Sequence, residues 1–337
     1  MPLPFDTSAL GLAATLAVAC LYGFISGFND GGNLLASFTA GRVISPRLGS
    51  LLLAAVVAGP LLLGLAVAQT IGTSVIDLGG QGELGFVLIT LSSLAVVLLS
   101  WRLGIPTSMT LALVGAMLGW VLSSGSLAAI RWPGVARVAL GMPLSAGAGL
   151  AFALLIYRLV RRALGGLPHA TVLALARLQV LTGALQAFAY GANDMEKTVG
   201  LVAVARVLPS VGHAVTFSDG PPVLLASALF VAGGILGGWG VARRVGFGVF
   251  RARPAQALAQ QLATGAVVAA LALAGAPVST TQTIDAGLIG VGAAHRASAV
   301  RWGVVREMLA SWLLTLPLAL LLAGAVHLAL RLLGLPQ

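Results

Sequence analysis

The chain has 337 residues, of which 58% are hydrophobic and only 8% charged, and its formal net charge at pH 7 is +10. Soluble domains carry about 25% charged residues, so this composition excludes a soluble globular protein and predicts an all-α polytopic membrane protein. The positive residues lie between apolar runs, which indicates membrane topology and not nucleic-acid binding. The single cysteine, Cys20, excludes an intramolecular disulfide and a cysteine-based metal site.

Apolar segments follow one another along nearly the whole chain, and about 20 apolar residues span a bilayer as a helix. About ten principal segments are predicted, at 9–28, 48–69, 84–101, 105–123, 136–157, 171–190, 222–240, 257–275, 277–294 and 307–330. The semi-polar stretches 29–45 and 191–210 are interpreted as broken or re-entrant helices, or as further spans, so the expected number of membrane elements is about 10–12. The N-terminal stretch has no basic residues, and we expect no cleaved signal peptide.

Arginines gather in alternate loops between these segments. If the N-terminus is outside, the inner loops hold most of them, among them Arg42, Arg47, Arg102, Arg158, Arg161, Arg162, Arg251, Arg253 and Arg301. The positive-inside rule therefore predicts a multi-pass protein of the cytoplasmic (inner) membrane with both termini on the outer face.

Two motifs occur twice, in the same order. "GFNDGGN" at 27–33 pairs with "GANDMEK" at 191–197, and "GIPTSMTLALVGAMLG" at 104–119 pairs with "GAPVSTTQTIDAGLIG" at 275–290. Each half holds an odd number of principal segments, so the halves must cross the membrane in opposite directions. We therefore predict two inverted repeats, 1–165 and 166–337, each with five principal spans, which is an architecture of secondary transporters.

The first motif pair places asparagine and aspartate at membrane depth, where an ionisable residue is costly and usually functional. The residues concerned are Asn29, Asp30 and Asn33 in the first half, and Asn193, Asp194 and Lys197 in the second. Carboxylate and amide oxygens in a glycine-rich break predict a cation site. The alternative for each motif alone is an aspartate at the end of a loop that caps the next helix.

The second motif pair places hydroxyl residues directly after a proline, which suits the start of a helix. The predicted residues are Thr107, Ser108 and Thr110 after Pro106, and Ser279, Thr280 and Thr281 after Pro277. A helix N-terminus offers free N–H groups and the positive end of the helix dipole, so it suits an anion. At membrane depth such a helix start predicts a half-helix or a re-entrant segment that lines a cavity. The alternative is an ordinary helix start in a loop.

Two further charged residues lie near these motifs. Lys197, which is the only lysine, occupies the position of Asn33 in the repeat, and its ammonium group either serves the site or extends to the lipid headgroups. Asp285, inside the segment after the second hydroxyl motif, is either a proton or ion relay or the partner of an arginine. Glu196 has no predicted role. The four histidines lie outside the motifs, and no metal site is predicted.

These paired motifs are similar to those of the inorganic phosphate transporter (PiT) family, which carries two "GANDVANAxG"-like signatures and two "G-[LI]-P-V-S-T-T-H" motifs in the same order. The resemblance implies a site built from both Asn-Asp signatures and both hydroxyl motifs. Leu111 and Gln282 replace the usual histidines, and Met109 replaces a hydroxyl residue. Lys197 resembles the "GANDxQK" form of short bacterial members and not the sodium-coupled form of the family.

From the residues and the resemblance together we expect a symporter of inorganic phosphate, without a cofactor and coupled to protons or to a metal carried with phosphate. Phosphate is expected at Thr107, Ser108, Thr110, Ser279, Thr280, Thr281, Lys197, Asn29 and Asn193, and the coupling ion at Asp30, Asn33, Asp194 and Asp285. The alternatives are a sodium-coupled phosphate symporter, a permease for a related anion such as sulfate, an intramembrane enzyme with Asp30 and Asp194 as a catalytic pair, and a structural scaffold. Membrane lipid and a second copy of the chain are the other expected partners.

Overall fold

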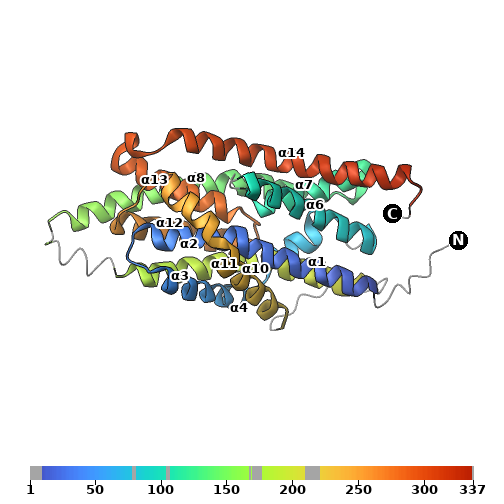
Figure 1. Cartoon of the computed structure of the whole chain (residues 1–337), viewed down its shortest axis with the longest axis horizontal. Helices are drawn as coiled ribbons and strands as arrows, with labels where there is room; N and C mark the ends of the chain where they lie inside the picture. Colours follow the sequence, from blue (N-terminus) through green and yellow to red (C-terminus); the bar gives the residue numbers. More distant parts are fainter. Residues whose placement is uncertain are drawn as a thin grey trace.

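The structure is a computed structural model that describes residues 10–77, 81–103, 107–166, 168, 177–208 and 221–335. Its elements are α1 (Leu10–Ser26), η1 (Gly27–Gly31), α2 (Gly32–Ala40), α3 (Pro46–Leu52), η2 (Leu53–Val57), α4 (Ala58–Leu63), α5 (Ala66–Gln69), η3 (Thr70–Ser74), α6 (Gly82–Leu103), α7 (Met109–Ser124), η5 (Leu127–Ala129), α8 (Trp132–Leu164), α10 (Gln179–Val207), α11 (Pro221–Gly248), α12 (Pro254–Leu273), α13 (Thr280–Arg296), η6 (Ala297–Ala299) and α14 (Trp302–Leu332). Figure 1 shows a bundle of long helices. The predicted all-α class is confirmed.

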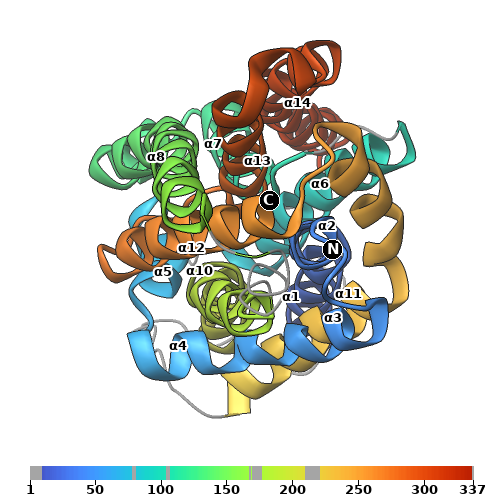
Figure 2. The same cartoon turned by 90° about the vertical axis from the view of Figure 1, so that its left-hand side faces the viewer.

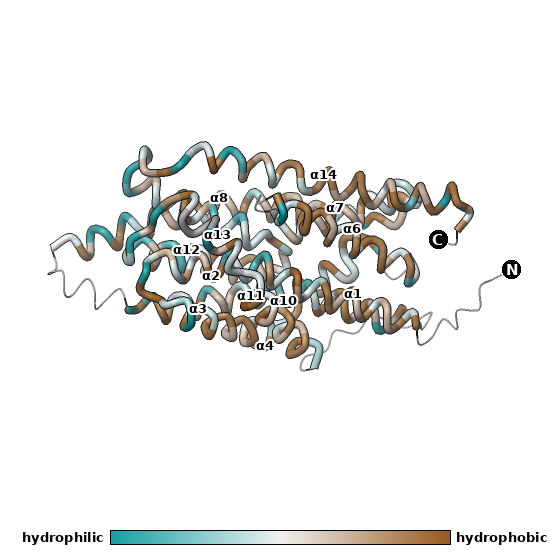
Figure 3. Tube along the Cα trace, in the orientation of Figure 1, coloured by the Kyte–Doolittle hydropathy of each residue, from teal (hydrophilic) through white to brown (hydrophobic). Residues whose placement is uncertain are grey.

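Seven helical stretches of the described part are long and apolar enough to cross a membrane. They are Leu10–Ala40, Pro46–Leu63, Gly82–Leu103, Trp132–Leu164, Pro221–Arg243, Pro254–Leu273 and Trp302–Leu332. Large leucine side chains cover the outside of these helices, and Leu62, Leu236 and Leu313 are each about three-quarters exposed (75%, 76% and 77%). Figure 3 shows hydrophobic stretches along α1 and α14 and hydrophilic ones gathered at the end of the bundle away from the chain termini. Apolar residues outside and polar residues inside are what a bilayer requires.

The first Asn-Asp signature lies inside a continuous helix. α1 passes through a π-helical turn, η1, directly into α2, so Leu10–Ala40 is one helical stretch of 31 residues. The predicted break after residue 28 is therefore wrong. Gly27 and Gly32 serve close packing on α11 instead, since a Cβ atom at Gly27 would lie 1.9 Å from the carbonyl oxygen of Phe230. A π-helical turn is rare and is frequent at functional sites.

The second signature lies in α10, which is also continuous. α10 packs against α1, α4, α11 and α12, and Figure 2 shows it among these helices when the bundle is viewed from one end. Of the stretch predicted as broken or re-entrant, residues 191–207 are helical and 209–210 lie outside the described residues. By contrast, the predicted segment 48–69 is interrupted after α4, where Gly64 adopts a φ of 89° before α5 begins.

The two hydroxyl motifs lie in helical hairpins that enter the bundle from opposite ends (Figure 1). Asp77, before α6, donates to the carbonyl of Ala129, after α7, at 3.1 Å, so both arms of the first hairpin meet at the same end. Likewise Arg301, after α13, donates to the carbonyl of Val249, before α12, at 3.1 Å. Two of the five segments expected in each half are therefore hairpin arms, which return to the end from which they came.

The hairpin also changes the position of Arg102, which the positive-inside rule predicted in an inner loop. Its neighbour Trp101 stacks edge-to-face on Phe28 with ring centroids 4.9 Å apart, and Phe28 lies in the middle of the α1–α2 stretch. Arg102 therefore lies beside the turn of the first hairpin, inside the length of the bundle.

The hairpins pack on long helices from the other half of the chain. α7 lies along α14, and α13 lies along α8. The start of α1 and the end of α14 lie at the same end of the bundle (Figure 1). This exchange of neighbours is what two inverted repeats lead us to expect, and the division at residue 165 stays a prediction.

Candidate functional site

Asp30 lies on the π-helical turn and is only 2% exposed. Its Oδ1 atom accepts hydrogen bonds from Asn29 Nδ2 at 2.9 Å and from Thr281 Oγ1 at 2.8 Å, and its Oδ2 atom accepts from Ser26 Oγ at 3.2 Å. All three donors are neutral. A buried carboxylate with neutral partners alone retains its charge at a high free-energy cost, so this position favours a bound cation or a proton.

Asn33 adds an oxygen beside Asp30. Its Nδ2 atom donates to Thr281 Oγ1 at 2.9 Å and to the carbonyl of Asn29 at 3.1 Å, while its Oδ1 atom is buried and has no hydrogen-bond partner among the described residues. The amide orientation thus leaves an acceptor free next to a carboxylate. Such an oxygen pair is suited to a hard cation.

Asp194 has a cationic partner, unlike Asp30. Its Oδ1 atom accepts from Lys197 Nζ at 2.8 Å and from Thr280 Oγ1 at 3.0 Å, and its Oδ2 atom has no partner in the described part of the chain. Lys197 is 1% exposed and also donates to the carbonyl of Val278 at 3.3 Å. The alternative that Lys197 extends to the headgroups is therefore wrong, because its ammonium group points into the protein.

The hairpin turns end in two capped helix starts. Ser108 Oγ accepts from the N–H of Leu111 at 3.2 Å, and Ser279 Oγ accepts from the N–H of Gln282 at 3.3 Å. Each cap gives a partner to one of the first N–H groups of its helix, and the N–H groups before it have no intrahelical partner. Thr110 Oγ1 donates to the carbonyl of Val278 at 3.0 Å, so the two turns are in contact. Ser108 and Ser279 are 1% and 2% exposed, which excludes the alternative of helix starts in ordinary loops.

Thr107 and the two signature asparagines, all predicted substrate ligands, make hydrogen bonds within the protein, and their role toward phosphate stays a prediction. Thr107 Oγ1 shares a hydrogen bond of 2.7 Å with Thr315 Oγ1 on α14. Asn29 Nδ2 donates to the carbonyl of Thr107, and Asn193 Nδ2 donates to the carbonyl of Ala276, both at 3.1 Å. The two signature asparagines therefore join each signature helix to a hairpin turn. Pro106 lies outside the described residues.

Asp285 is fully buried on α13, about one and a half turns beyond Thr280. Neither of its carboxylate oxygens has a hydrogen-bond partner in the described part of the chain. It has no arginine partner there, so that alternative is not supported. It also makes no hydrogen bond to the residues around Asp30 and Asp194, and its expected role as a coupling-ion ligand stays a prediction.

Sequence reasoning missed three residues that shape the site. Ser26 lies four residues before Asp30, and this spacing on a helix was a usable signal. Thr315 had no such signal, because it meets Thr107 only through the packing of α7 on α14. Glu196 Oε2 accepts from the N–H groups of Val67 at 2.7 Å and Ala68 at 3.2 Å, so it caps the start of α5.

The charge of the assembled site follows from its members. Asp30 and Asp194 carry two formal negative charges and Lys197 one positive charge, which leaves one negative charge if all three are ionised. The free N–H groups of α7 and α13 suit an anion, whereas the carboxylates repel one. The arrangement can therefore hold an anion only together with protons or cations.

Comparison with known proteins gives the chain a family. The phosphate transporter family matches residues 26–323. A "probable low-affinity inorganic phosphate transporter" of Rhizobium meliloti is 31% identical over 322 residues, which cover 94% of this chain and 96% of that protein. The protein of the same name from Bacillus subtilis is 29% identical over 320 residues, covering 93% and 95%.

A solved structure has the same fold. It is described as "the sodium-dependent phosphate transporter". The two structures superpose with a TM-score of 0.79 over 94% of this chain and 99% of the other, and their sequences are 20% identical. The relatives are transporters and not enzymes, so the alternative of an intramembrane enzyme falls away. The chain is a multi-pass membrane protein that belongs to the phosphate transporter family.

Proposed function

We propose that this protein is a secondary active symporter of inorganic phosphate. The observation that carries the proposal is the contact between two capped, buried helix starts beside Asp30 and Asp194, where Thr280 and Thr281 donate to the two carboxylates. The relatives named as inorganic phosphate transporters support the choice of substrate. Phosphate lies, in this proposal, at the N-termini of α7 and α13, within reach of Ser108, Ser279, Thr280 and Thr281.

Coupling follows from electrostatics. Phosphate carries one or two negative charges at neutral pH, and the ionised site already carries a net negative charge. Like charges in a medium of low dielectric repel strongly, so phosphate enters with protons or cations that neutralise it. Binding of the pair then biases one set of helices to rock against the other, as in transporters with inverted repeats.

We propose protons as the main coupling ion, because the ammonium group of Lys197 occupies the second signature. Lys197 Nζ lies 2.8 Å from Asp194 Oδ1 and fills the place where a sodium ion would need oxygen ligands. A divalent metal carried with phosphate meets the same electrostatic need.

A sodium-coupled symporter is the second candidate. The free Oδ1 atom of Asn33 beside Asp30 favours it, and so does the name of the similar structure, a sodium-dependent phosphate transporter. The two candidates differ in which signature binds the ion: Asp30 with Asn33 for sodium, or the Asp194–Lys197 pair for a proton.

Uptake into proteoliposomes tests the proposal. Radiolabelled phosphate and sulfate are supplied separately, with a pH gradient and a sodium gradient imposed one at a time. Phosphate uptake driven by the pH gradient, with little sulfate uptake, is the expected result. Sulfate uptake at an equal rate would overturn the substrate assignment, and uptake under the sodium gradient alone would favour the second candidate.

The setting in the cell is part of the same proposal. We place the chain in the cytoplasmic membrane with both termini outside, because hydrophilic residues gather at the end of the bundle away from the start of α1 and the end of α14 (Figure 3). The helix ends and connections there hold most of the arginines, as expected for an inner face. Labelling of single cysteines introduced at Arg158 and at Leu333, in intact cells with an impermeant maleimide, checks this orientation: only Leu333→Cys should react.

A further inference from the structure

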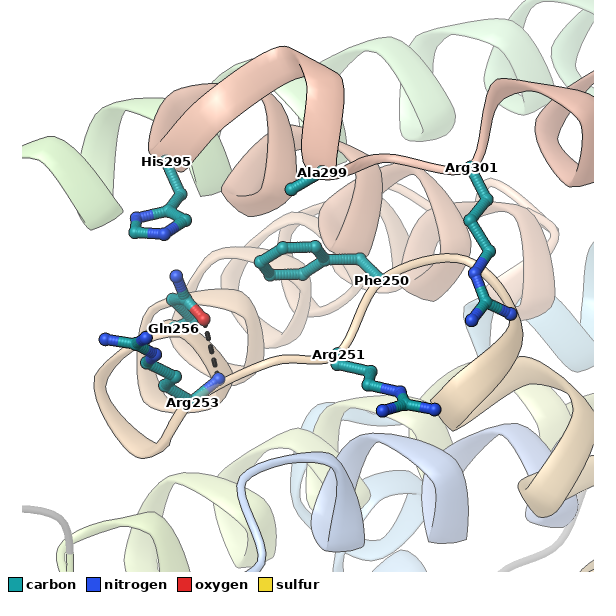
Figure 4. A pocket seen from close by; sticks show the side chains of 7 residues that line it. All are labelled: Phe250, Arg251, Arg253, Gln256, His295, Ala299 and Arg301. Atoms are coloured by element: carbon teal, nitrogen blue, oxygen red, sulfur yellow. Dashed lines mark hydrogen bonds between the residues drawn. The ribbon is translucent and has the colours of Figure 1, made fainter.

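A cavity lies at the end of the bundle away from the termini, at the base of the hairpin formed by α12 and α13. It has a volume of about 410 Å³ and is lined by Phe250, Arg251, Arg253, Gln256, His295, Ala299 and Arg301. Figure 4 shows Arg251 and Arg253 on the segment that leads into α12, and Arg301 before α14. The side chains of Arg251 and Arg301 extend toward the same side of the pocket, whereas that of Arg253 extends to the other side, near His295. Pockets for small molecules typically have volumes of about 300–1,000 Å³, so this cavity is large enough for a small ligand.

The lining of this cavity is positively charged and contains no acidic side chain. None of its three arginines forms an ion pair with a described residue. The ion pair that the described part of the chain does contain joins Lys197 and Asp194 inside the bundle. The guanidinium groups of Arg251 and Arg301 lie on the same side of the cavity, and two like charges repel each other unless an anion lies between them. The cavity therefore has unused capacity for negative charge.

Arg131 in the first half gives an internal comparison for Arg301. Both precede a tryptophan, and both donate a backbone hydrogen bond to the segment before a hairpin: Arg131 to Val75 at 3.0 Å and Arg301 to Val249 at 3.1 Å. The Arg131 guanidinium also donates to the carbonyl of Thr73. The Arg301 side chain lines the cavity instead (Figure 4), so the shared backbone role does not account for it.

One wall of the cavity is held in place by hydrogen bonds. Gln256 Oε1 accepts from the N–H of Arg253 at 2.6 Å, and Gln256 Nε2 donates to Tyr157 Oη at 3.3 Å. Tyr157 Oη in turn lies 3.2 Å from His295 Nδ1. These contacts join α12, α8 and α13, so the backbone that carries Arg253 is fixed before any ligand arrives, which lowers the entropy lost on binding.

We propose that this pocket binds a phosphate group, either of inorganic phosphate or of an anionic lipid headgroup. Guanidinium groups donate two parallel hydrogen bonds to phosphate oxygens, which matches this ligand better than a point charge does. A phosphate bound between Arg251 and Arg301 bridges the two ends of the α12–α13 hairpin, whose turn carries Ser279, Thr280 and Thr281. The pocket is thus a second anion site, separate from the proposed transport site.

Protection of arginines from phenylglyoxal, read by peptide mass spectrometry, tests this proposal on the unmodified protein. One arm adds inorganic phosphate at constant ionic strength to protein in phosphatidylcholine nanodiscs, and the other replaces part of that lipid with phosphatidylglycerol. With ligand at about ten times its dissociation constant, modification of Arg251 and Arg301 should slow about tenfold. Arg131 and Arg296, which are exposed and do not line the pocket, are the controls.

The arms distinguish the source of the phosphate group. Protection by inorganic phosphate in phosphatidylcholine identifies a soluble ligand, and protection that needs phosphatidylglycerol identifies a headgroup. No protection in either arm, or equal protection of Arg131 and Arg296, overturns the proposal. The proposed transport site contains no arginine, so loss of phosphate uptake and loss of protection are independent results.

Discussion

Thr281, in the first turn of α13, donates a hydrogen bond of 2.8 Å to Asp30, which lies 251 positions earlier in the chain. Its neighbour Thr280 donates to Asp194 at 3.0 Å. Two consecutive hydroxyl residues at one hairpin turn therefore contact one aspartate from each signature. An anion that accepts a hydrogen bond from Thr280 or Thr281 removes that bond from a buried carboxylate. The binding of the anion and the binding of the coupling cation therefore depend on the same hydroxyl groups.

The two aspartates should both be needed for transport. We expect Asp30→Asn and Asp194→Asn each to abolish phosphate uptake while the protein still inserts and folds, because the amide keeps the shape and removes the charge that balances the coupling ion. Uptake into proteoliposomes and the elution profile in size-exclusion chromatography measure the two properties. Glu307→Gln, at an exposed position on α14, is the control. Near-normal uptake in both variants contradicts the site assignment.

The second hydroxyl motif should set the affinity for phosphate. Ser279→Ala or Thr280→Ala is expected to weaken the apparent affinity by about 1–3 kcal/mol, the cost of a buried polar group left without a partner. Ser108→Ala should act in the same way at the first helix start. The concentration dependence of phosphate uptake measures the effect.

Ser124→Ala provides the matched control for the hydroxyl motif. Ser124 is the last residue of α7, at the end away from the proposed phosphate site, and its hydroxyl donates to the carbonyl of Val121. The affinity of this variant should stay at the wild-type value. An equal loss in the control, or a phosphate found far from both helix starts, contradicts the assignment.

Thr107 should matter for stability more than for affinity. Because its hydroxyl pairs with that of Thr315, Thr107→Val and Thr315→Val should each lower the unfolding free energy by about 1 kcal/mol, and the double variant should lose less than the sum. Thermal unfolding in detergent measures this coupling. Additive losses would contradict the pairing of the two hydroxyl groups. A large loss of phosphate affinity in Thr107→Val would show that Thr107 is a phosphate ligand.

Glu196 should stabilise the interrupted second span. Its carboxylate accepts from two N–H groups at the start of α5, so Glu196→Gln should lower the unfolding free energy by about 1 kcal/mol, as for loss of a charged cap. Thermal unfolding and uptake are compared with those of Glu307→Gln. A change in the coupling ion with no change in stability would place Glu196 among the transport residues instead.

The membrane class, the motif pairs and both capped helix starts could be predicted from the sequence, because composition, proline and hydroxyl residues report local structure. The continuity of the helix through Gly27–Gly31 could not be predicted. These glycines pack on α11, and local composition does not reveal that contact. The hairpin arms were counted among the principal spans, because apolar composition does not distinguish an arm that returns from a helix that crosses. The proline and hydroxyl motifs nevertheless predicted a half-helix or re-entrant segment at each turn. The contact of Thr281 with Asp30 depends on how the two halves pack together.

Lys197 should decide which ion drives transport. A sodium ion needs oxygen ligands and cannot share a small site with an ammonium group, whereas a buried lysine can release a proton in one conformational state. Lys197 already lies 2.8 Å from Asp194 and 3.3 Å from the carbonyl of Val278, within the protein interior. We therefore expect uptake driven mainly by a proton gradient, with at most a partial sodium requirement through Asp30 and Asn33.

The test is phosphate uptake at fixed pH with sodium replaced by choline, in the wild type and in Lys197→Asn. The wild type should retain most of its uptake in choline. Lys197→Asn removes the ammonium group and supplies an amide oxygen, as Asn33 does in the first half, so it should lose proton-driven uptake. Any uptake that it keeps should require sodium, because the new oxygen completes a ligand set beside Asp194. Complete loss of wild-type transport without sodium, together with unchanged transport in Lys197→Asn, would show that the lysine has no part in coupling.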